Sequence, residues 1–352
     1  MTSKVLHLVD HMGLGGAQRV VDSMLDIDMH EAHALSRSTN CVNRPKKYSV
    51  TDKTYIINLK CVLDVCNLVK NKDLDYIHCH MPMAKIVGLF AVVVCPGDTK
   101  VIFHEHGSIH RQWSIYEMFI RVSDRWVDEH ISVSEKGKDL LTEVGVEDEK
   151  ISVIRNFADL PRYEDSELRK FRPTSNPNAE KCCFNVGFAG RITERKGWRD
   201  FVRCTEYVSG AEFLIAGHGK ESGVLKKRIE SKEEIHYLGY IDDIRQLLSR
   251  IDCLVIPSHW DPNPLIFYEG LASETPVVAS RCECLKEITR DGRNCLEFEP
   301  GNSEEMADKI HKFRENDRFR QKIVDEGTRF AERNSKSKFL DKFRDLYADS
   351  KQ

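Results

Sequence analysis

The chain has 352 residues, a formal net charge of −3 and 12 cysteines. This length suffices for two domains with separate cores, and the near-neutral charge excludes a whole-chain attraction to nucleic acid or anionic lipid. No apolar run reaches the ~18 residues of a membrane-spanning helix, and the first residues lack the features of a signal peptide. We therefore expect a cytoplasmic protein, with its cysteines reduced because they form no paired CxxC clusters of zinc-site spacing.

The first half of the chain alternates strand-like and helix-like segments. It begins with the apolar run KVLHLVD, the glycine loop HMGLGG and a helix predicted over residues 17–29. Further strands are predicted at residues 32–36, 55–59, 75–80, 101–106, 130–134 and 151–155. Strands separated by helix-length segments predict a parallel sheet covered on both faces.

The alternation stops at residues 160–181, which are charged, contain proline and show no apolar period, as in a linker. It restarts with strands predicted at residues 183–189, 212–216, 235–238, 253–257, 277–279 and 295–298. The predicted fold class is therefore α/β, with one doubly wound domain at residues 1–165 and a second at residues 178–330. Ligands of such domains bind beyond the carboxyl ends of the strands, so the loops there are the candidate sites.

The loop GLGGAQ follows the first strand. Gly15 and Gly16 allow a close approach to a ligand, and the next helix can receive an anion at its start. The loop imitates a dinucleotide fingerprint, although Arg37 stands where an acidic residue would hold the ribose. An NADP-dependent reductase is therefore one alternative.

The loop HEHGS follows the predicted strand at residues 101–106. His104 and His106 share one face of an extended chain, but the sequence shows no third metal ligand nearby. We interpret the histidine at the strand end as a hydrogen-bonding partner of a substrate hydroxyl rather than a metal ligand, and we predict no metal site.

Two further loops combine cations, a helix start and carboxylates. In FAGRITERKGW, Gly190 is followed by Arg191 and Lys196, which can bind two phosphates and stabilise a diphosphate leaving group. In the stretch 258–280, Asn263 is the predicted N-cap and Pro264 the first helical residue. The N–H groups of Leu265 and Ile266 then form an anion site, flanked by the carboxylates Asp261 and Glu269. A nucleotide sugar has phosphates in its middle and hydroxyls at both ends, which suits this arrangement.

The ordered set of motifs resembles a known family. GLGGAQ, HEHG, SEKGKDLLTEVG, GRITERKG, FLIAGHGKE, YLGYIDD and DPNPLIFYEGLASETPVVAS together are similar to retaining glycosyltransferases of family 4, over about residues 4 to 300. The resemblance implies a GT-B fold, in which two Rossmann-like domains face each other across a cleft. It also implies that the C-terminal domain holds the nucleotide and that a final helix, at about residues 336–352, packs back on the N-terminal, acceptor-side domain.

The resemblance also implies roles for individual residues. Arg191 and Lys196 would bind the donor diphosphate, and Glu269 would accept both ribose hydroxyls. Asp261 stands where the family usually has glutamate and would hold a hydroxyl of the donor sugar. His106 would meet the sugar near its reacting carbon. The remaining positions would line the nucleotide sugar: Gly15 and Gly16 over the phosphates, Gly190, Asn263, Pro264, Leu265 and Ile266 at the two central loops, and Gly239, Tyr240 and Ile241 at the base.

The expected reaction is transfer of a hexose-type sugar from a nucleoside diphosphate sugar, with UDP favoured, to a hydroxyl acceptor. The acceptor would be a glycan or lipid-linked glycan of cell-surface polysaccharide or lipopolysaccharide synthesis, and the transfer would retain configuration without metal or cofactor. The apolar stretches 83–94 and 113–127 are either core helices or a surface for peripheral membrane contact. A catalytically inert partner subunit and a nucleotide-sugar epimerase remain further alternatives.

Overall fold

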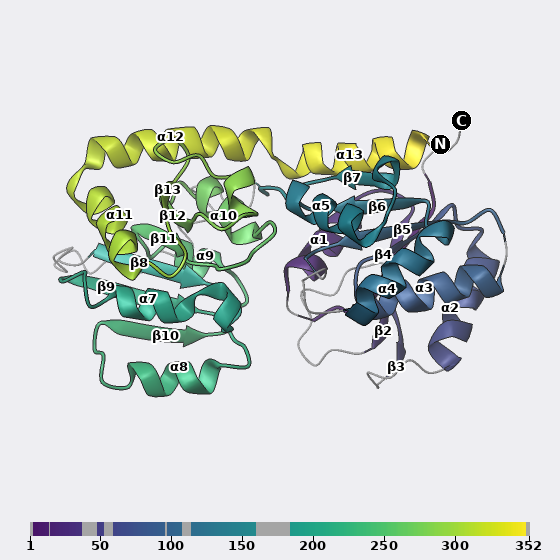
Figure 1. Ribbon diagram of the computed structural model, residues 1–352, viewed down its shortest axis with the longest axis horizontal. Coiled ribbons are helices and arrows are strands. Elements are labelled where there is room, and N and C mark those ends of the chain that lie inside the picture. Colours follow the sequence, from purple (N-terminus) through teal and green to yellow (C-terminus); the bar gives the residue numbers. More distant parts are fainter. Residues whose placement is uncertain are drawn as a thin grey trace. The chain divides into compact units, whose positions relative to one another are not determined.

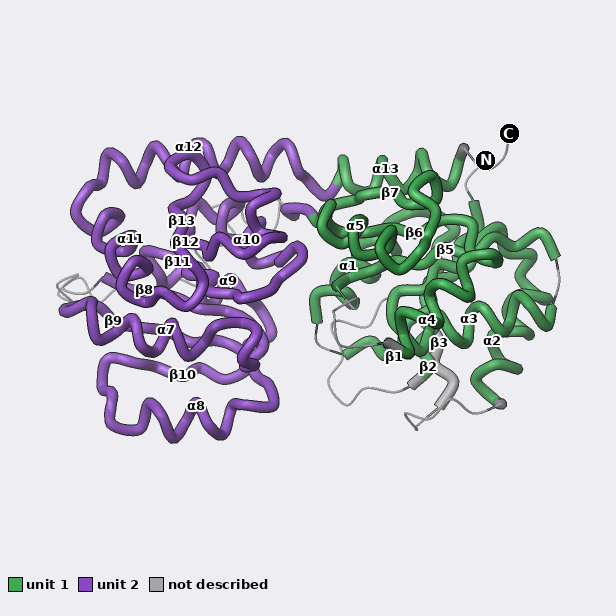
Figure 2. The backbone as a smooth tube through the Cα atoms, in the orientation of Figure 1, with its two compact units in different colours: residues 1–156, 337–352 green, residues 157–336 purple. Residues whose placement is uncertain are grey.

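The computed structural model describes residues 3–13, 15–36, 48–52, 59–95, 97–107, 114–159 and 184–349. The chain divides into two compact units, one of Met1–Asn156 with Ser337–Gln352 and the other of Phe157–Lys336 (Figure 2). The division falls before the predicted domain end at residue 165, because Ala158 already bonds within the second unit. Its N–H donates to the Asn334 carbonyl (2.8 Å), and its carbonyl accepts from the Lys336 N–H (2.8 Å). The predicted linker lies outside the described residues.

The first unit is built on a seven-stranded sheet with the order β3-β2-β1-β4-β5-β6-β7. All neighbouring strands are parallel. The strands are β1 (Val5–His11), β2 (His30–Ser36), β3 (Tyr48–Asp52), β4 (Tyr76–Cys79), β5 (Lys100–Glu105), β6 (Glu129–Ser132) and β7 (Ile151–Val153). The strand order reverses direction between β1 and β4, so the loops after these two strands meet at a switch point of the sheet.

Helices cover both faces of this sheet (Figure 1). They are α1 (Gly16–Met24), α2 (Leu59–Lys72), α3 (Pro82–Val94), α4 (Ser114–Ser123), α5 (Glu135–Val144) and, from the end of the chain, α13 (Lys336–Asp349). Local signals define α5 well: the Ser134 side chain accepts from the Gly137 N–H (3.0 Å), and Gly145 ends the helix in the left-handed conformation.

The second unit has a six-stranded parallel sheet with the order β10-β9-β8-β11-β12-β13. Its strands are β8 (Phe184–Ala189), β9 (Ala211–Ala216), β10 (Ile235–Gly239), β11 (Cys253–Ile256), β12 (Val277–Ser280) and β13 (Leu296–Phe298). Its helices are α7 (Trp198–Cys204), α8 (Ser222–Ile229), α9 (Arg245–Leu248), α10 (Leu265–Ala272), α11 (Ser303–Glu315) and α12 (Asp317–Arg333). Here the strand order reverses between β8 and β11.

Two elements of the first unit differ from the predictions. The helix predicted over residues 17–29 ends at Met24, because the chain must turn before β2 begins at His30, and it does so with Leu25 and Ile27 buried. The strand predicted at residues 55–59 falls mostly outside the described residues, and Leu59 is the first residue of α2. The strand found in this part of the chain is β3, which the apolar pattern did not predict.

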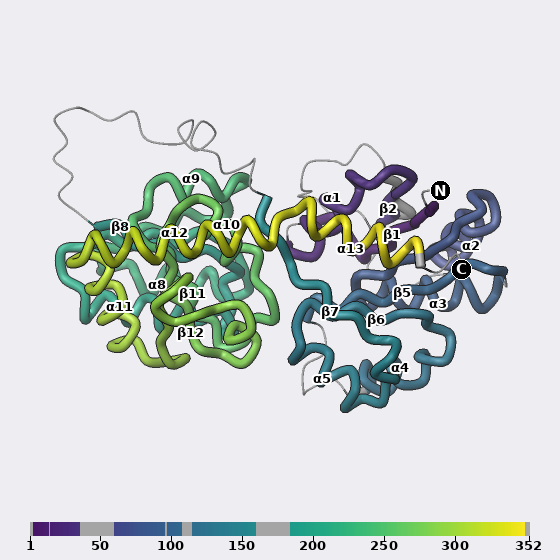
Figure 3. Tube along the Cα trace, turned by 90° about the horizontal axis from the view of Figure 1, so that it is seen from above, coloured from purple at the N-terminus to yellow at the C-terminus, as the bar shows by residue number. Residues whose placement is uncertain are grey.

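The C-terminal helix α13 packs on the sheet of the first unit (Figure 3). The Tyr347 hydroxyl lies 2.6 Å from Nδ1 of His78 on β4, and the Ser3 hydroxyl donates to the Tyr347 carbonyl (3.0 Å). Phe343 is fully buried and lies against the rings of His78 and His104. The face of the sheet that carries these histidines is therefore closed by the last helix of the chain.

The described cysteines are all free thiols and buried. In the part of the chain that the structure describes, no helix combines the length and the apolar character needed to cross a membrane.

Acid is expected to destabilise this fold. Burial lowers the pKa of His33 to about 4 and that of His106 and of His130 to about 3, and it lowers the pKa of four more histidines well below the ordinary value, namely His7, His78, His80 and His104. Because these pKa values lie below the unfolded value of about 6.5, the stabilisation is present above that pH and is lost as the pH falls toward the folded values. At pH 5.5 each such histidine lowers the free energy of unfolding by up to about 1.4 kcal/mol.

Several of these contributions together approach the whole stability of a typical domain, about 5–15 kcal/mol. Urea unfolding at pH 7.5 and pH 5.5, at equal ionic strength, should therefore show a loss of several kcal/mol at the lower pH. Equal free energies of unfolding at both values would contradict the expectation.

Candidate functional site

The loop after β8 carries the predicted phosphate-binding cations. Gly190 follows the strand directly, and its N–H donates to the Ala216 carbonyl (3.1 Å). Lys196 ends the short 3-10 turn Glu194–Lys196, while Arg191 is exposed. Both cations therefore lie beyond the carboxyl end of a central strand, where an α/β sheet binds ligands.

This loop is packed tightly against the loop after β11. Gly197 has φ +69°, and a Cβ atom there would lie 1.8 Å from the Pro257 carbonyl oxygen. The His259 N–H also donates to the Arg195 carbonyl (2.9 Å). A glycine is required at position 197 both for the left-handed backbone and for this approach, which fixes Lys196 relative to the second loop.

The contact between the two loops includes an ion pair between Lys196 and Asp261. Their side chains are only 17% and 8% exposed, and the Ser258 hydroxyl lies 3.4 Å from the same Asp261 oxygen. A pair this shielded from water is screened less by salt than a surface pair. Asp261 therefore holds the Lys196 ammonium in place beside the start of α10.

The environment of Arg191 is also charged. Loss of surrounding water, and then the Arg195 charge, lower the pKa of Arg191 from its ordinary value, whereas Asp261 raises it. An arginine remains charged despite such shifts. The Arg191 side chain is exposed, so its guanidinium can fork two oxygens of an anion.

The helix start at α10 differs by one residue from the prediction. Pro264, not Asn263, is the N-cap, with an extended backbone (φ −72°, ψ 125°), and its carbonyl accepts from the Phe267 N–H (3.1 Å). Leu265 and Ile266 are thus the first two helical residues, whose N–H groups point out of the helix end. The two N–H groups predicted to bind an anion therefore still lie at the helix start, and Asn263 is a buried residue of the preceding loop.

Glu269 lies one turn into α10, four residues after Leu265 and hence on the same side of the helix. It is buried, as is Asp261. Both carboxylates that the sequence singled out therefore flank the helix start from inside the second unit.

Of the residues predicted for the base, Gly239 ends the edge strand β10, and Tyr240 and Ile241 follow it. Gly239 is joined to the central loops through Gly217, whose N–H donates to the Gly239 carbonyl (2.7 Å). Gly217 has φ +136°, and a Cβ atom there would lie 1.8 Å from the Gly190 carbonyl oxygen. Gly217 was not predicted as a site residue, although the glycines of AGHGK mark such a close approach in the sequence.

The other predicted residues belong to the first unit and are described within it. Gly15 is the N-cap of α1 and Gly16 its first residue, at the loop after β1. His106 follows β5 and is partly buried. Arg37, the residue that disfavours a dinucleotide site, lies outside the described residues.

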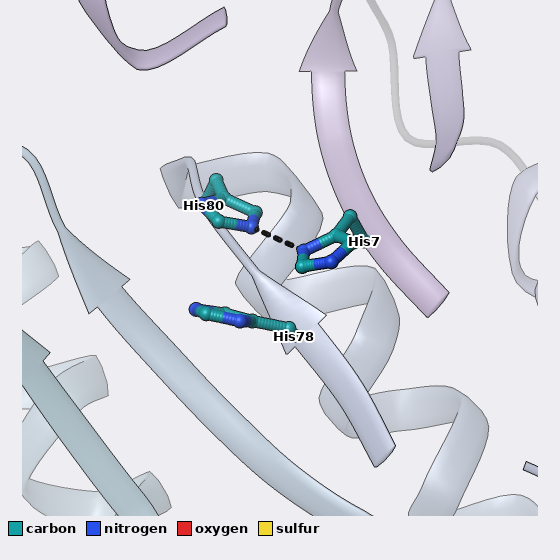
Figure 4. Close-up of side chains that lie close together, drawn as sticks. All are labelled: His7, His78 and His80. Carbon is teal, nitrogen blue, oxygen red and sulfur yellow. Dashed lines mark hydrogen bonds between the residues drawn. The ribbon is translucent and has the colours of Figure 1, made fainter. Parts of the chain in front are cut away.

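The interpretation of HEHGS needs one correction. The sequence shows no third ligand beside His104 and His106, but the structure places His80 there, and one ring nitrogen from each of these three residues lies within 4.8 Å of the other two. A second such group is His7, His78 and His80, with His7 and His80 hydrogen-bonded (Figure 4). Alternate positions of a strand share one face, so the HxH pattern was a usable signal once the order of strands was known.

Comparison with known structures identifies the class of fold. The Anabaena protein Alr3699/HepE, solved in complex with UDP and glucose, matches 98% of this chain and 99% of its own with a TM-score of 0.84, at 19% identity. The two doubly wound units thus form a GT-B fold, as the motifs predicted.

Family models identify the protein more closely. A model of "Glycosyltransferase Family 4" matches residues 15–162, and a model of "Glycosyl transferases group 1" matches residues 183–316. The chain belongs to the family-4-type glycosyltransferases.

Two curated relatives extend over much of the chain. An uncharacterised 41.2 kDa protein of the cps region of Klebsiella pneumoniae is 22% identical over 85% of this chain and 87% of its own length. The Escherichia coli UDP-Gal:alpha-D-GlcNAc-diphosphoundecaprenol alpha-1,3-galactosyltransferase is 23% identical over 68% of this chain and 64% of its own.

Proposed function

We propose that this glycosyltransferase moves a hexose-type sugar from a UDP-sugar to a hydroxyl of a glycan or lipid-linked glycan in cell-surface polysaccharide or lipopolysaccharide synthesis. The E. coli relative is named for a UDP-Gal donor and a lipid-diphosphate-linked acceptor, and the Anabaena structure contains UDP and glucose. The E. coli name supports both the donor class and the acceptor class of the proposal, and the Anabaena title supports UDP as the nucleotide.

The observation that carries the proposal is the Lys196–Asp261 pair beside the start of α10. This part of the second unit brings together the Lys196 ammonium and the N–H groups of Leu265 and Ile266, and the ion pair is shielded from water. Preorganised donors of this kind stabilise charge that develops on a leaving group. A diphosphate bound there would share Lys196 with Asp261, and Arg191 would add a bidentate contact.

The carboxylates have separate roles in the proposal. Glu269 accepts the two ribose hydroxyls, and Asp261 accepts a hydroxyl of the donor sugar while it orients Lys196. Because Asp261 is one methylene shorter than glutamate, the sugar must come closer to the backbone of this loop. Asp261 is thus the position at which we place the choice of donor sugar.

The proposed transfer retains configuration and needs neither a metal nor a cofactor. The bond between the sugar's anomeric carbon and the diphosphate oxygen breaks, the acceptor oxygen bonds to that carbon on the same face, and the acceptor proton passes to the leaving phosphate. Lys196 and Arg191 supply the positive charge that a divalent cation supplies in other transferases.

A panel of UDP-, GDP- and ADP-sugars tests the donor. A UDP-sugar should raise the melting temperature of the full-length protein, and transfer should be undiminished in excess EDTA. A shift with another nucleotide alone would refute UDP as the donor, and a requirement for manganese would refute the metal-free reaction. Absence of any shift would favour an inert partner subunit, donor turnover without acceptor would indicate an epimerase, and nicotinamide binding would indicate a reductase.

Lys196→Ala should lower turnover by on the order of 100-fold, because one preorganised charge-stabilising donor is lost. Lys227→Ala, at an exposed lysine of α8 in the same unit, is the matched control and should leave turnover unchanged. Lys196→Arg keeps the charge and should recover part of the activity. Turnover is compared at saturating donor, with urea unfolding to show that each variant folds; near-wild-type turnover of folded Lys196→Ala would reject the role of this residue.

Peripheral membrane contact is a second part of the proposal, and exposed apolar side chains of the first unit support it. On α4, Tyr116 and Ile120 are buried while Ile115, Met118 and Val122 are exposed, with Ile115 at 78%. The three exposed residues are spaced as one side of a helix. Exposed apolar residues on one side of a helix suit a contact with a partner or with lipid, and a lipid-linked acceptor would be reached there.

Vesicle flotation checks this surface. The full-length protein should float with vesicles containing phosphatidylglycerol, and the double variant Met118→Glu/Val122→Glu should not, because two charges would enter the apolar interface. Val224→Glu, at an exposed apolar residue of α8 in the second unit, is the control and should float like the wild type. A wild-type protein that stays with the soluble fraction would remove membrane contact from the proposal.

A further inference from the structure

Four histidines of the first unit form a continuous hydrogen-bonded chain. Nδ1 of His30 lies 2.9 Å from Nε2 of His7, Nδ1 of His7 lies 3.0 Å from Nε2 of His80, and Nδ1 of His80 lies 3.1 Å from Nε2 of His106. Each contact joins the Nδ1 of one ring to the Nε2 of the next. The order runs from His30 on β2 through His7 on β1 and His80 after β4 to His106 after β5. We call these four residues the histidine relay.

The relay is sealed from water along most of its length. His30, His7 and His80 are each at most 1% exposed. Tyr347 of α13 packs edge-on against the His30 ring, with centroids 5.1 Å apart. Only His106, at the strand end, is partly exposed.

Three imidazoles of the relay, those of His7, His80 and His106, are neutral at physiological pH. Burial is the main reason that the pKa of His7 and that of His80 fall well below the ordinary value, with neighbouring histidines as the second cause. Burial, followed by the Lys85 charge, lowers the pKa of His106 to about 3. A neutral imidazole has one N–H donor and one acceptor nitrogen.

Neutral rings joined in this way must share a tautomer. If Nδ1 carries the proton on His30, it donates to His7, which must then carry its own proton on Nδ1 and donate to His80, and so on to His106. If Nε2 carries the proton on His106, the same argument runs back to His30. A ring of the opposite tautomer would place two N–H groups or two lone pairs face to face in a dry core, which costs more than a single hydrogen bond gains.

A metal ion is the rival explanation for clustered histidines. Its support is that Nε2 of His78 and both ring nitrogens of His104 are buried without a hydrogen-bond partner among the described residues. Each candidate trio, however, contains a pair of nitrogens already bonded to one another, and within the described residues only histidines make up these groups.

Electrostatics also disfavour a cation here. The charge of the buried Lys85 already lowers the pKa of His78, His104 and His106, and Lys85 is paired with Glu105, which alternates with the histidines along β5 and so points to the other face. A divalent ion held by these groups would have only histidine ligands among the described residues and so no anionic ligand there, at a large desolvation cost.

We propose that His30, His7 and His80 are positioning residues that set which ring nitrogen of His106 carries the proton. With Nε2 of His106 engaged by His80, Nδ1 is the nitrogen that can meet a ligand, and the relay decides whether it donates or accepts. The assignment of that ligand as the donor sugar rests on the proposed function. The shared tautomer of the relay is a property of the folded chain and does not depend on the proposed function.

Nitrogen-15 NMR of the full-length protein, labelled at the histidine rings, tests the relay. Protonated and unprotonated ring nitrogens have well-separated resonances, and each histidine is assigned by single substitution. The wild type should show one common tautomer for all four relay residues. In His7→Phe, which keeps ring volume but removes both hydrogen bonds, His80 and His106 should populate both tautomers.

His78→Phe is the matched control. It removes an equally buried ring from the same face of β4 and leaves the three relay bonds intact, so His106 should keep its wild-type tautomer. Different tautomers among the four wild-type rings would overturn the proposal whatever the behaviour of His7→Phe. So would an unchanged His106 in folded His7→Phe, or a stoichiometric metal ion whose removal shifts the ring resonances.

Activity then tests the link to catalysis. His7→Phe should lower kcat about 10-fold while UDP binding, which the second unit provides in the proposal, stays unchanged; this loss corresponds to ~1.4 kcal/mol. If His106 populates both tautomers in His7→Phe while kcat is unaltered, the relay has only a structural role. If no nucleotide sugar is turned over by the wild type, the NMR result still decides the relay, and only the proposed function fails.

Discussion

The side-by-side position of β8 and β11 is the constraint on which the candidate donor site depends. The sheet reverses its strand order at this pair, so the two loops that leave its carboxyl ends start next to each other. The missing side chain of Gly197 lets them touch at the Pro257 carbonyl, and Lys196 then reaches Asp261. The helix start of α10 follows within the same loop, so cation, carboxylate and N–H groups are positioned by backbone packing rather than by flexible side chains.

The first unit repeats the arrangement with different chemistry. Its strand order reverses between β1 and β4, and the neighbouring parallel strands carry histidines on one face, closed by α13. Buried polar rings are costly unless they are hydrogen-bonded, and four of them, those of His30, His7, His80 and His106, bond to one another here. Histidines thus occupy alternate positions of adjacent parallel strands. Unpaired rings would destabilise the core, whereas these rings form an ordered hydrogen-bonded chain that ends at His106.

Much of the fold followed from local signals. Runs of β-branched residues predicted most strands to within one or two residues, and the glycine loop and Pro264 marked the starts of α1 and α10 to within one residue. The failures have separate causes. Helix α1 is cut short by the turn that starts β2, β3 has too weak an apolar pattern to be recognised alone, and Pro264 takes the cap position because its carbonyl bonds to Phe267.

The sequence by itself determined the family, the two α/β units and the identity of the residues at the strand ends, because these depend on periodicity and on motifs within short windows. Only the tertiary structure decided which of those residues meet. Lys196 and Asp261 are 65 positions apart, and His80 and His106 are 26 apart. Their contact depends on which strands are neighbours and in which register. That information resides in the packing of whole sheets, where a side chain's partners come from other strands and not from its own.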